Sequence, residues 1–155
     1  AGMLNRIYNV SKLEHPISAF DKLDQFKLFL FDTGLLKQMA GIDNSAILLK
    51  STYQFKGQLT ENYVLQQLRG QFDVMPRYFS SRNGEIDIVL QYGMDIIPVE
   101  TKGGEDKSAL TFKKYVADNH PQYAVRFSKM GYRKDGNITN IPLYLVGKTK
   151  ELLGG

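Results

Sequence analysis

Apolar and polar positions alternate in two neighbouring stretches near the middle of the chain. The stretches are residues 84–91 and 95–102. Strict alternation over about four to eight residues is typical of a half-buried β-strand. The short connection contains Gly93 and Met94, and a glycine in such a position favours a tight turn. The pattern therefore predicts a β-hairpin with a two-residue loop.

This hairpin predicts which side chains share a face. If Gly93 and Met94 form the loop, antiparallel pairing places Asp87 opposite Glu100, and Lys102 falls on the same face. The other face is apolar and is expected to be core, with Ile86, Ile88, Leu90, Ile97 and Val99. Glu85 alternates onto the apolar side or the entry of the strand, so we interpret it as structural.

A helical pattern precedes the hairpin. In residues 58–69, apolar positions recur at the spacing of a helix face, with Glu61 at the head of a stripe that continues through Val64, Leu65 and Leu68. A carboxylate on such a stripe needs a partner, because an unpaired buried charge is costly. The polar face of the hairpin is the candidate partner.

Three carboxylates that converge to about 5 Å repel one another by roughly 3 kcal/mol per pair at an effective dielectric of about 20. A divalent cation would offset this repulsion. Oxygen ligands in a chain with no cysteine and two histidines favour Mg²⁺ or Mn²⁺ over zinc. The reaction class that fits is metal-assisted phosphodiester hydrolysis, with a lysine ammonium beside the metal. The alternative for each residue taken singly is a solvated strand face.

The arrangement of Glu61, Asp87 and Glu100-Thr101-Lys102 resembles the PD-(D/E)XK nuclease superfamily. The wider sequence resembles a domain of unknown function that follows the ATPase module in prokaryotic AAA+ proteins. That likeness rests on the segments 26–36, 55–64, 97–104 and 141–144.

This resemblance implies a restriction-endonuclease-like α/β core. It implies catalytic roles for Glu61, Asp87, Glu100 and Lys102, and metal binding by Asp87, Glu100 and the backbone carbonyl of Thr101. It also implies an upstream AAA+ ATPase module as partner.

Basic residues are concentrated in one part of the chain. Residues 102–134 hold eight lysines and arginines against three acidic residues, although the whole chain has a net charge of only +4. Such a region favours contact with phosphates. The candidate nucleic-acid-binding residues are Lys113, Lys114, Arg126, Lys129, Arg133 and Lys134. A solvated helix face is the alternative for Lys113 and Lys114, and a generic basic loop for the others.

In the first third of the chain, the pattern of apolar, glycine and proline residues predicts a strand at 3–10, a loop at 12–24, a strand at 26–31 and a short helix at 33–41. By resemblance, this region is a short winged-helix-like remnant. We therefore expect an N-terminal segment and connector at 1–45 and a nuclease-like domain at 46–155.

The later part predicts a helix at 107–119, a strand at 123–128, a loop at 131–140 and a strand at 141–146. After the Glu61 helix, the order is then three strands, a helix and two strands. This order is typical of an α/β protein with a mixed sheet flanked by helices.

Composition limits the remaining options. The length suits one domain. The absence of cysteine excludes disulfides and is compatible with a cytoplasmic location. No apolar run approaches the roughly 18 residues of a membrane helix. The sequence opens on Ala1-Gly2 and not on methionine, so we expect it to be an excerpt of a longer protein.

Two hypotheses follow. The first is a metal-dependent nuclease-like domain acting on nucleic acid, with DNA favoured over RNA. The alternative is a catalytically inactive module that binds nucleic acid or protein and regulates the ATPase. The oligomeric state stays open.

Overall fold

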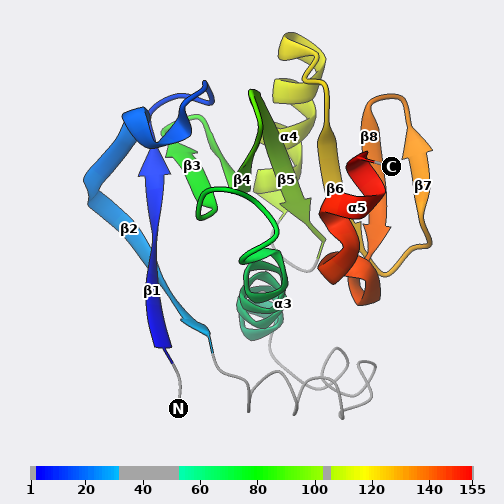
Figure 1. Cartoon of the computed structure of the whole chain (residues 1–155), viewed down its shortest axis with the longest axis horizontal. Helices are drawn as coiled ribbons and strands as arrows, with labels where there is room; N and C mark the ends of the chain where they lie inside the picture. The colour runs from blue at the N-terminus through cyan, green and yellow to red at the C-terminus, as the bar shows by residue number, and fades with distance from the viewer. Residues whose placement is uncertain (1–2, 32–52, 103–105, 155) are drawn as a thin grey trace.

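The computed structural model describes residues 3–31, 53–102 and 106–154, and within them one mixed β-sheet carries helices on both faces (Figure 1). The sheet has eight strands in the order β2-β1-β3-β4-β5-β6-β8-β7. The strands are β1 (Met3–Val10), β2 (Asp21–Phe31), β3 (Arg77–Ser81), β4 (Gly84–Tyr92), β5 (Asp95–Thr101), β6 (Ala124–Ser128), β7 (Arg133–Asp135) and β8 (Ile138–Pro142). The prediction of an α/β protein with a mixed sheet flanked by helices is confirmed.

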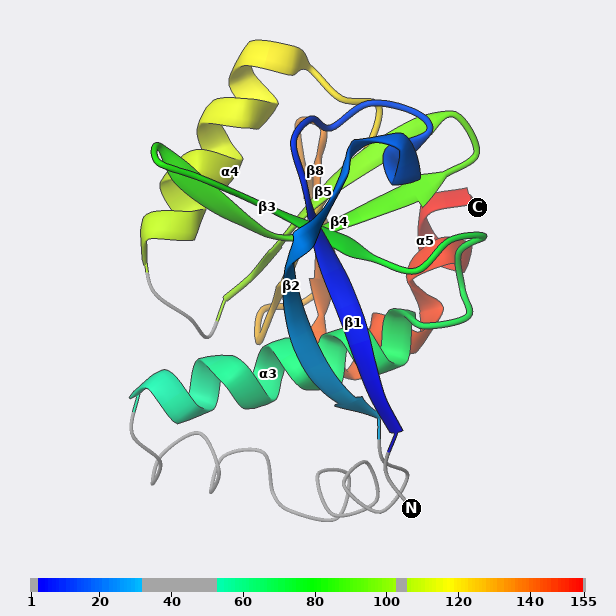
Figure 2. The same cartoon turned by 90° about the vertical axis from the view of Figure 1, so that its left-hand side faces the viewer.

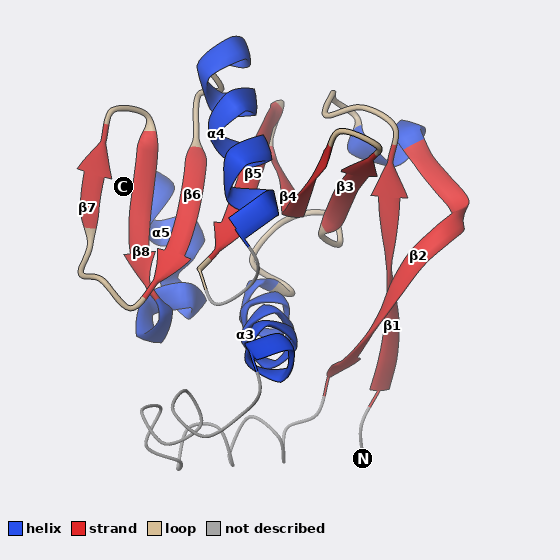
Figure 3. Ribbon diagram, turned by 180° about the vertical axis from the view of Figure 1, so that it is seen from behind, coloured by secondary structure: helices blue, strands red, loops and turns tan. Residues whose placement is uncertain are grey.

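Three α-helices lie within the described residues. α3 (Tyr53–Leu68) and α5 (Thr149–Gly154) cover one face of the sheet, and α4 (Asp106–Asn119) covers the other (Figures 2 and 3). We call these sides the α3 face and the α4 face. No helix in the described ranges is both long enough and apolar enough to cross a membrane.

The main core lies on the α3 face. Its buried residues include Val64, Leu65 and Leu68 of α3, together with Ile88, Leu90, Ile97, Val99, Val125, Phe127, Ile141 and Val146. The last of these belongs to the 3-10 helix η2 (Leu143–Lys148), which follows β8. On the α4 face, Phe112 and Val116 pack against Ala124 of β6. The stripe predicted to follow Glu61 is therefore core.

The hairpin of β4 and β5 has the predicted register. Pairing runs from Ile88 opposite Val99 to Tyr92 opposite Asp95, which leaves a two-residue turn. The first turn residue, Gly93, has φ 60, and the primed turns of tight hairpins require a positive φ at this position. The predicted apolar face is confirmed for four of its five residues, Ile88, Leu90, Ile97 and Val99.

The fifth residue, Ile86, departs from the prediction because β4 contains a bulge. Val89 pairs with Arg77 and Ile86 pairs with Phe79, so two residues of β4 lie opposite Tyr78 alone. A bulge inserts one residue and reverses the alternation of side chains beyond it. Ile86 consequently packs with Val89 on the α4 face and not in the main core.

The N-terminal strands β1 and β2 belong to the same sheet as the rest of the chain (Figure 1). β1 pairs in parallel with β3 through Asn9 and Tyr78. The Asn9 side chain accepts a hydrogen bond from the Ser80 backbone N–H and donates one to the Ser80 carbonyl. Asp21 accepts two hydrogen bonds from the Arg77 guanidinium, at 2.9 and 3.0 Å. The predicted domain boundary after residue 45 lies outside the described residues.

Several element predictions are confirmed and some are wrong. The strands at 3–10 and 123–128 and the helix at 107–119 are β1, β6 and α4. The loop predicted at 12–24 is too long, because the 3-10 helix η1 (Ile17–Phe20) and the start of β2 fall inside it. The helix predicted at 33–41 lies outside the described residues.

The C-terminal strands were predicted least well. The strand at 141–146 is wrong beyond Pro142, where β8 ends and η2 begins. Proline has no N–H for the sheet ladder, so it ends the pairing. The loop predicted at 131–140 contains the strand β7. Its three residues are all charged and exposed, so no apolar alternation marks this strand in the sequence.

Candidate functional site

The candidate site lies on the α3 face, at the end of the sheet where β4 begins and β5 ends. In Figure 2 the β3–β4 turn and the first turn of α4 point toward the same side as the first turns of α3. Three carboxylates lie near enough there to interact through their charges: Glu61 from α3, and Glu85 and Asp87 from β4. The charges of Asp87 and Glu85 raise the pKa of Glu61, and the charge of Glu85 raises the pKa of Asp87.

The bulge in β4 orients Asp87. Ile88 lies in the main core on the α3 face, and regular alternation would turn the preceding residue away. The extra residue keeps Asp87 on the α3 face, where both the backbone N–H and the hydroxyl of Thr101 donate to its Oδ2 at 3.3 Å. Bulges often have this effect next to functional sites.

Burial raises the pKa of Asp87 to about 6, because a carboxylate withdrawn from water loses solvation. The backbone hydrogen bond from Thr101 lowers this pKa, and the charge of Glu85 raises it again. The remaining influences, the charge of Lys27 and the Thr101 hydroxyl, both lower it. The desolvation of the carboxylate is the largest of these contributions.

The pKa of Glu61 is also strongly raised. Burial raises its pKa to about 7, the charge of Lys27 lowers it, and the charges of Asp87 and Glu85 raise it further. The side chain is only 19% exposed, and its Oε1 is buried without a hydrogen-bond partner. A buried oxygen that lacks a partner is costly unless a ligand or ion supplies one.

The cation that faces these carboxylates is Lys27 of β2, a residue that the sequence patterns did not single out. Its ammonium donates a hydrogen bond to Glu85 and lies 3.8 Å from Oε1 of Glu61, too far for a hydrogen bond. It also lies 4.5 Å from the centre of the Tyr78 ring. One signal was present in the sequence: Lys27 is the only charged residue in the apolar run 26–31.

Burial lowers the pKa of Lys27, but its interactions with Glu61, Glu85 and Asp87 outweigh burial and hold this pKa above its ordinary value. Lys27 therefore stays charged. Glu85 lies at the entry of β4, as expected, and there it bonds this cation and influences the charge state of Asp87.

Glu100 lies on the opposite face of the sheet. It alternates with Val99, which is in the main core, and it pairs across β5 and β6 with Arg126. Nε of Arg126 donates to Oε2 of Glu100 at 2.9 Å, and the Glu100 side chain is only 3% exposed. The predicted meeting of Asp87 and Glu100 on one face is not observed, because the bulge turns Asp87 while Glu100 keeps the regular alternation.

Lys102 lies just beyond the end of β5. Its backbone N–H donates to the carbonyl of Phe127 at 2.8 Å, while its side chain is exposed. Among the described residues, no ion pair or side-chain hydrogen bond links Lys102 to the carboxylates. The structure thus brings together Glu61, Asp87 and Thr101 of the predicted site and adds Lys27 and Glu85.

The donor chemistry of this site suits a hard divalent ion, with two carboxylates as its core. Within the described ranges, no three acidic or histidine side chains are gathered closely enough to hold an ion. Mg²⁺, however, usually retains several waters and binds one or two carboxylates together with substrate phosphates. Glu61, with its unpartnered oxygen, and Asp87 fit that requirement.

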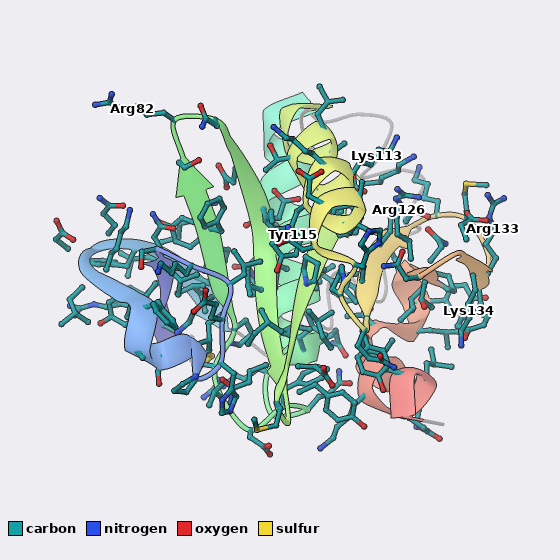
Figure 4. The ribbon with its side chains drawn as sticks, turned by 90° about the horizontal axis from the view of Figure 1, so that it is seen from above. Arg82, Lys113, Tyr115, Arg126, Arg133 and Lys134 are labelled. Carbon is teal, nitrogen blue, oxygen red and sulfur yellow. The ribbon has the colours of Figure 1, made fainter. Side chains whose placement is uncertain are left out.

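Figure 4 labels four of the basic candidates, Lys113 on α4, Arg126 on β6, and Arg133 and Lys134 on β7. The side chains of Lys113, Lys114, Lys129 and Lys134 are exposed. Arg133 is exposed but bonds Asp135, and Arg126 is largely buried against Glu100. Arg82, at the tip of the β3–β4 turn, is a further exposed cation that the sequence patterns did not identify.

The described chain is thus an α/β protein with a mixed sheet and a carboxylate cluster at one end. A family model named "Domain of unknown function (DUF4143)" matches residues 56–146, which is more than half of the chain. The chain belongs to this family. Comparison with curated proteins and with solved structures gave no match.

Proposed function

We propose that the chain is a metal-dependent nuclease-like domain that hydrolyses phosphodiester bonds in nucleic acid. The observation that carries this proposal is the placement of Glu61 and Asp87 on one face, withdrawn from water and with one carboxylate oxygen unpartnered. The order α3, β3, β4, β5, α4, β6 supports a restriction-endonuclease-like core, because the antiparallel hairpin is followed by a helical crossover to a parallel strand.

In this proposal Glu61 and Asp87 hold Mg²⁺ or Mn²⁺, and the bonds from Thr101 fix the orientation of Asp87. When bound, the ion supplies Lewis acidity toward the scissile phosphate. Lys102, exposed at the end of β5, is free to approach a phosphate oxygen. By the family resemblance, Glu100 and the Thr101 carbonyl are further ligands, and Glu100 would have to leave Arg126 to serve as one.

The partners belong to the same proposal. Nucleic acid, with DNA preferred to RNA, would approach the end of the sheet that Lys102 and Arg82 border. The exposed Lys113, Lys114, Lys129 and Lys134 would add phosphate contacts that hold substrate without reading its sequence. In the full-length protein, an AAA+ ATPase module in the cytoplasm would deliver the substrate.

A cleavage assay tests the activity. Single-stranded, duplex and branched DNA and the corresponding RNAs are incubated with the domain in Mg²⁺, in Mn²⁺ and in EDTA. We expect cleavage that requires metal and is lost in Asp87→Asn and Lys102→Ala. The matched control is Asp95→Asn, at the far end of the same hairpin, which should cleave normally. Cleavage that persists in EDTA, or in Asp87→Asn, would contradict the proposed site.

A second function is favoured by the pairing of Glu100 with Arg126. A buried ion pair at 2.9 Å occupies a carboxylate that an active site would need for metal binding. The second candidate is therefore an inactive module that binds nucleic acid and regulates the ATPase. It predicts salt-dependent binding without turnover on every substrate. Loss of binding in a Lys113→Gln/Lys114→Gln variant, with no cleavage by the wild type, would favour it.

A further inference from the structure

The N-terminal ribbon of β1 and β2 contributes a side chain to the candidate site. Lys27 comes from β2, 58 positions before its hydrogen-bond partner Glu85, and β2 precedes the segment from α3 to β6 in the chain. Its side chain is 34% exposed, and its ammonium lies 4.5 Å from the centre of the Tyr78 ring. This placement fixes a positive charge beside the carboxylates.

The Lys27 ammonium lies beside Glu61, one of the two carboxylates that a metal would need. It lies 3.8 Å from Oε1 of Glu61, the same oxygen that has no hydrogen-bond partner. It bonds Glu85, and its charge also acts on Asp87. Coulomb repulsion between an ammonium and a divalent ion a few ångströms apart is large even at an effective dielectric of about 20.

We propose that Lys27 is a built-in counter-ion of this site, and that the Lys27 ammonium and a divalent cation compete for Glu61 and Asp87. This inference rests on the proposed function, because it assumes that the two carboxylates bind metal. Lys27 then sets the metal affinity from the N-terminal ribbon. Any movement of that ribbon which withdraws Lys27 strengthens metal binding at the α3 face.

The distances to the carboxylates differ between Lys27 and Arg126. Nε of Arg126 lies at hydrogen-bond distance from the carboxylate of Glu100. Lys27 makes one such bond, to Glu85, and leaves Glu61 at a distance at which only a charge interaction remains. Glu61 is therefore incompletely neutralised and can exchange the ammonium for a stronger cation.

Direct measurement of Mn²⁺ binding tests the competition. The intact chain is titrated with Mn²⁺ while the free ion is followed by electron paramagnetic resonance, and isothermal calorimetry gives the Kd. The variants are Lys27→Met, Lys27→Gln and Lys27→Arg, with Lys22→Met as the control on the same strand and Asp87→Asn as the control that removes the site. Circular dichroism melts identify any variant that does not fold, and Lys27→Gln replaces Lys27→Met if the latter fails.

We expect Lys27→Met and Lys27→Gln to lower the Kd for Mn²⁺ about tenfold or more, because the competing charge is gone. Lys27→Arg and Lys22→Met should remain close to the wild type, and Asp87→Asn should lose binding. An unchanged or higher Kd in both neutral variants, with binding still lost in Asp87→Asn, would overturn the role of Lys27 and leave the metal site intact. Absence of Mn²⁺ binding in every variant would overturn the metal site and the competition with it.

Discussion

The two faces of the sheet differ in how completely their buried polar groups are paired. On the α4 face, Glu100 is bonded by Arg126 in register, and Ser128 donates to the side chain of Asn140 at 2.7 Å. On the α3 face, the carboxylates of Glu61 and Glu85 share the ammonium of Lys27, and an oxygen of Glu61 lacks a hydrogen bond. The buried polar groups of the α4 face are paired, whereas the α3 face holds incompletely neutralised charge, which is common at functional sites.

Removal of Arg126 should have the largest effect on this contrast. Arg126→Met leaves the carboxylate of Glu100 buried without a partner, and breaking a buried ion pair in this way costs about 3–5 kcal/mol of unfolding free energy. Urea denaturation measures the loss. The double variant Arg126→Met/Glu100→Gln should recover part of it, since no charge then remains buried. A loss below about 1 kcal/mol in the single variant would show that Glu100 is solvated.

The α3 face should respond to pH in the opposite sense from an ordinary ion pair. The pKa of Glu61 is raised to about 7 from its ordinary value of 4.5, so the folded state binds this proton more tightly than the unfolded chain. The resulting stabilisation is complete below about pH 4.5 and is lost as the pH rises to about 7. The shift corresponds to about 3 kcal/mol as an order of magnitude.

Melting curves in metal-free buffer check this prediction, with Glu61→Gln as reference because it cannot ionise. Wild type and Glu61→Gln should be similar near pH 4.5, and Glu61→Gln should be the more stable of the two at pH 8. A constant difference between them across this range would mean that Glu61 titrates at its ordinary pKa.

The comparison also explains what the sequence could predict. The register of β4 and β5 and the apolar stripe of α3 follow from local periodicity, with periods of 2 and 3.6 residues, and both were predicted. The bulge at Asp87 depends on how β4 pairs with β3, and the sequence patterns gave β3 no boundaries. The partners of Lys27 and Glu100 depend on pairings 58 and 26 positions apart, which no local pattern contains.

Gly84 is the first residue of β4. It precedes Glu85, which lies at the candidate site, and it packs closely against Thr111 of α4 on the other face. A Cβ at this position would lie 2.9 Å from the Cβ of Thr111 and closer still to its hydroxyl, and Gly84 has φ 150. Gly84→Ala should therefore cost about 1–3 kcal/mol through overpacking. Gly131→Ala, with no atom nearby and no positive φ, is the control and should stay within about 0.5 kcal/mol of wild type. Equal melting temperatures for the two variants would contradict close packing at Gly84.

The smallest effect on stability is expected at Lys102, and it sharpens the distinction between the two lysines near the site. The Lys102 side chain is exposed, so Lys102→Met should change the unfolding free energy by less than about 0.5 kcal/mol. Its proposed role is toward a phosphate, so the same change should weaken nucleic-acid binding and reduce the slope of log K against log salt by about one. Fluorescence anisotropy at several salt concentrations measures that slope. A large drop in melting temperature would mean that the Lys102 side chain stabilises the fold. An unchanged salt slope would mean that Lys102 makes no phosphate contact, because a lost contact must release one counterion fewer.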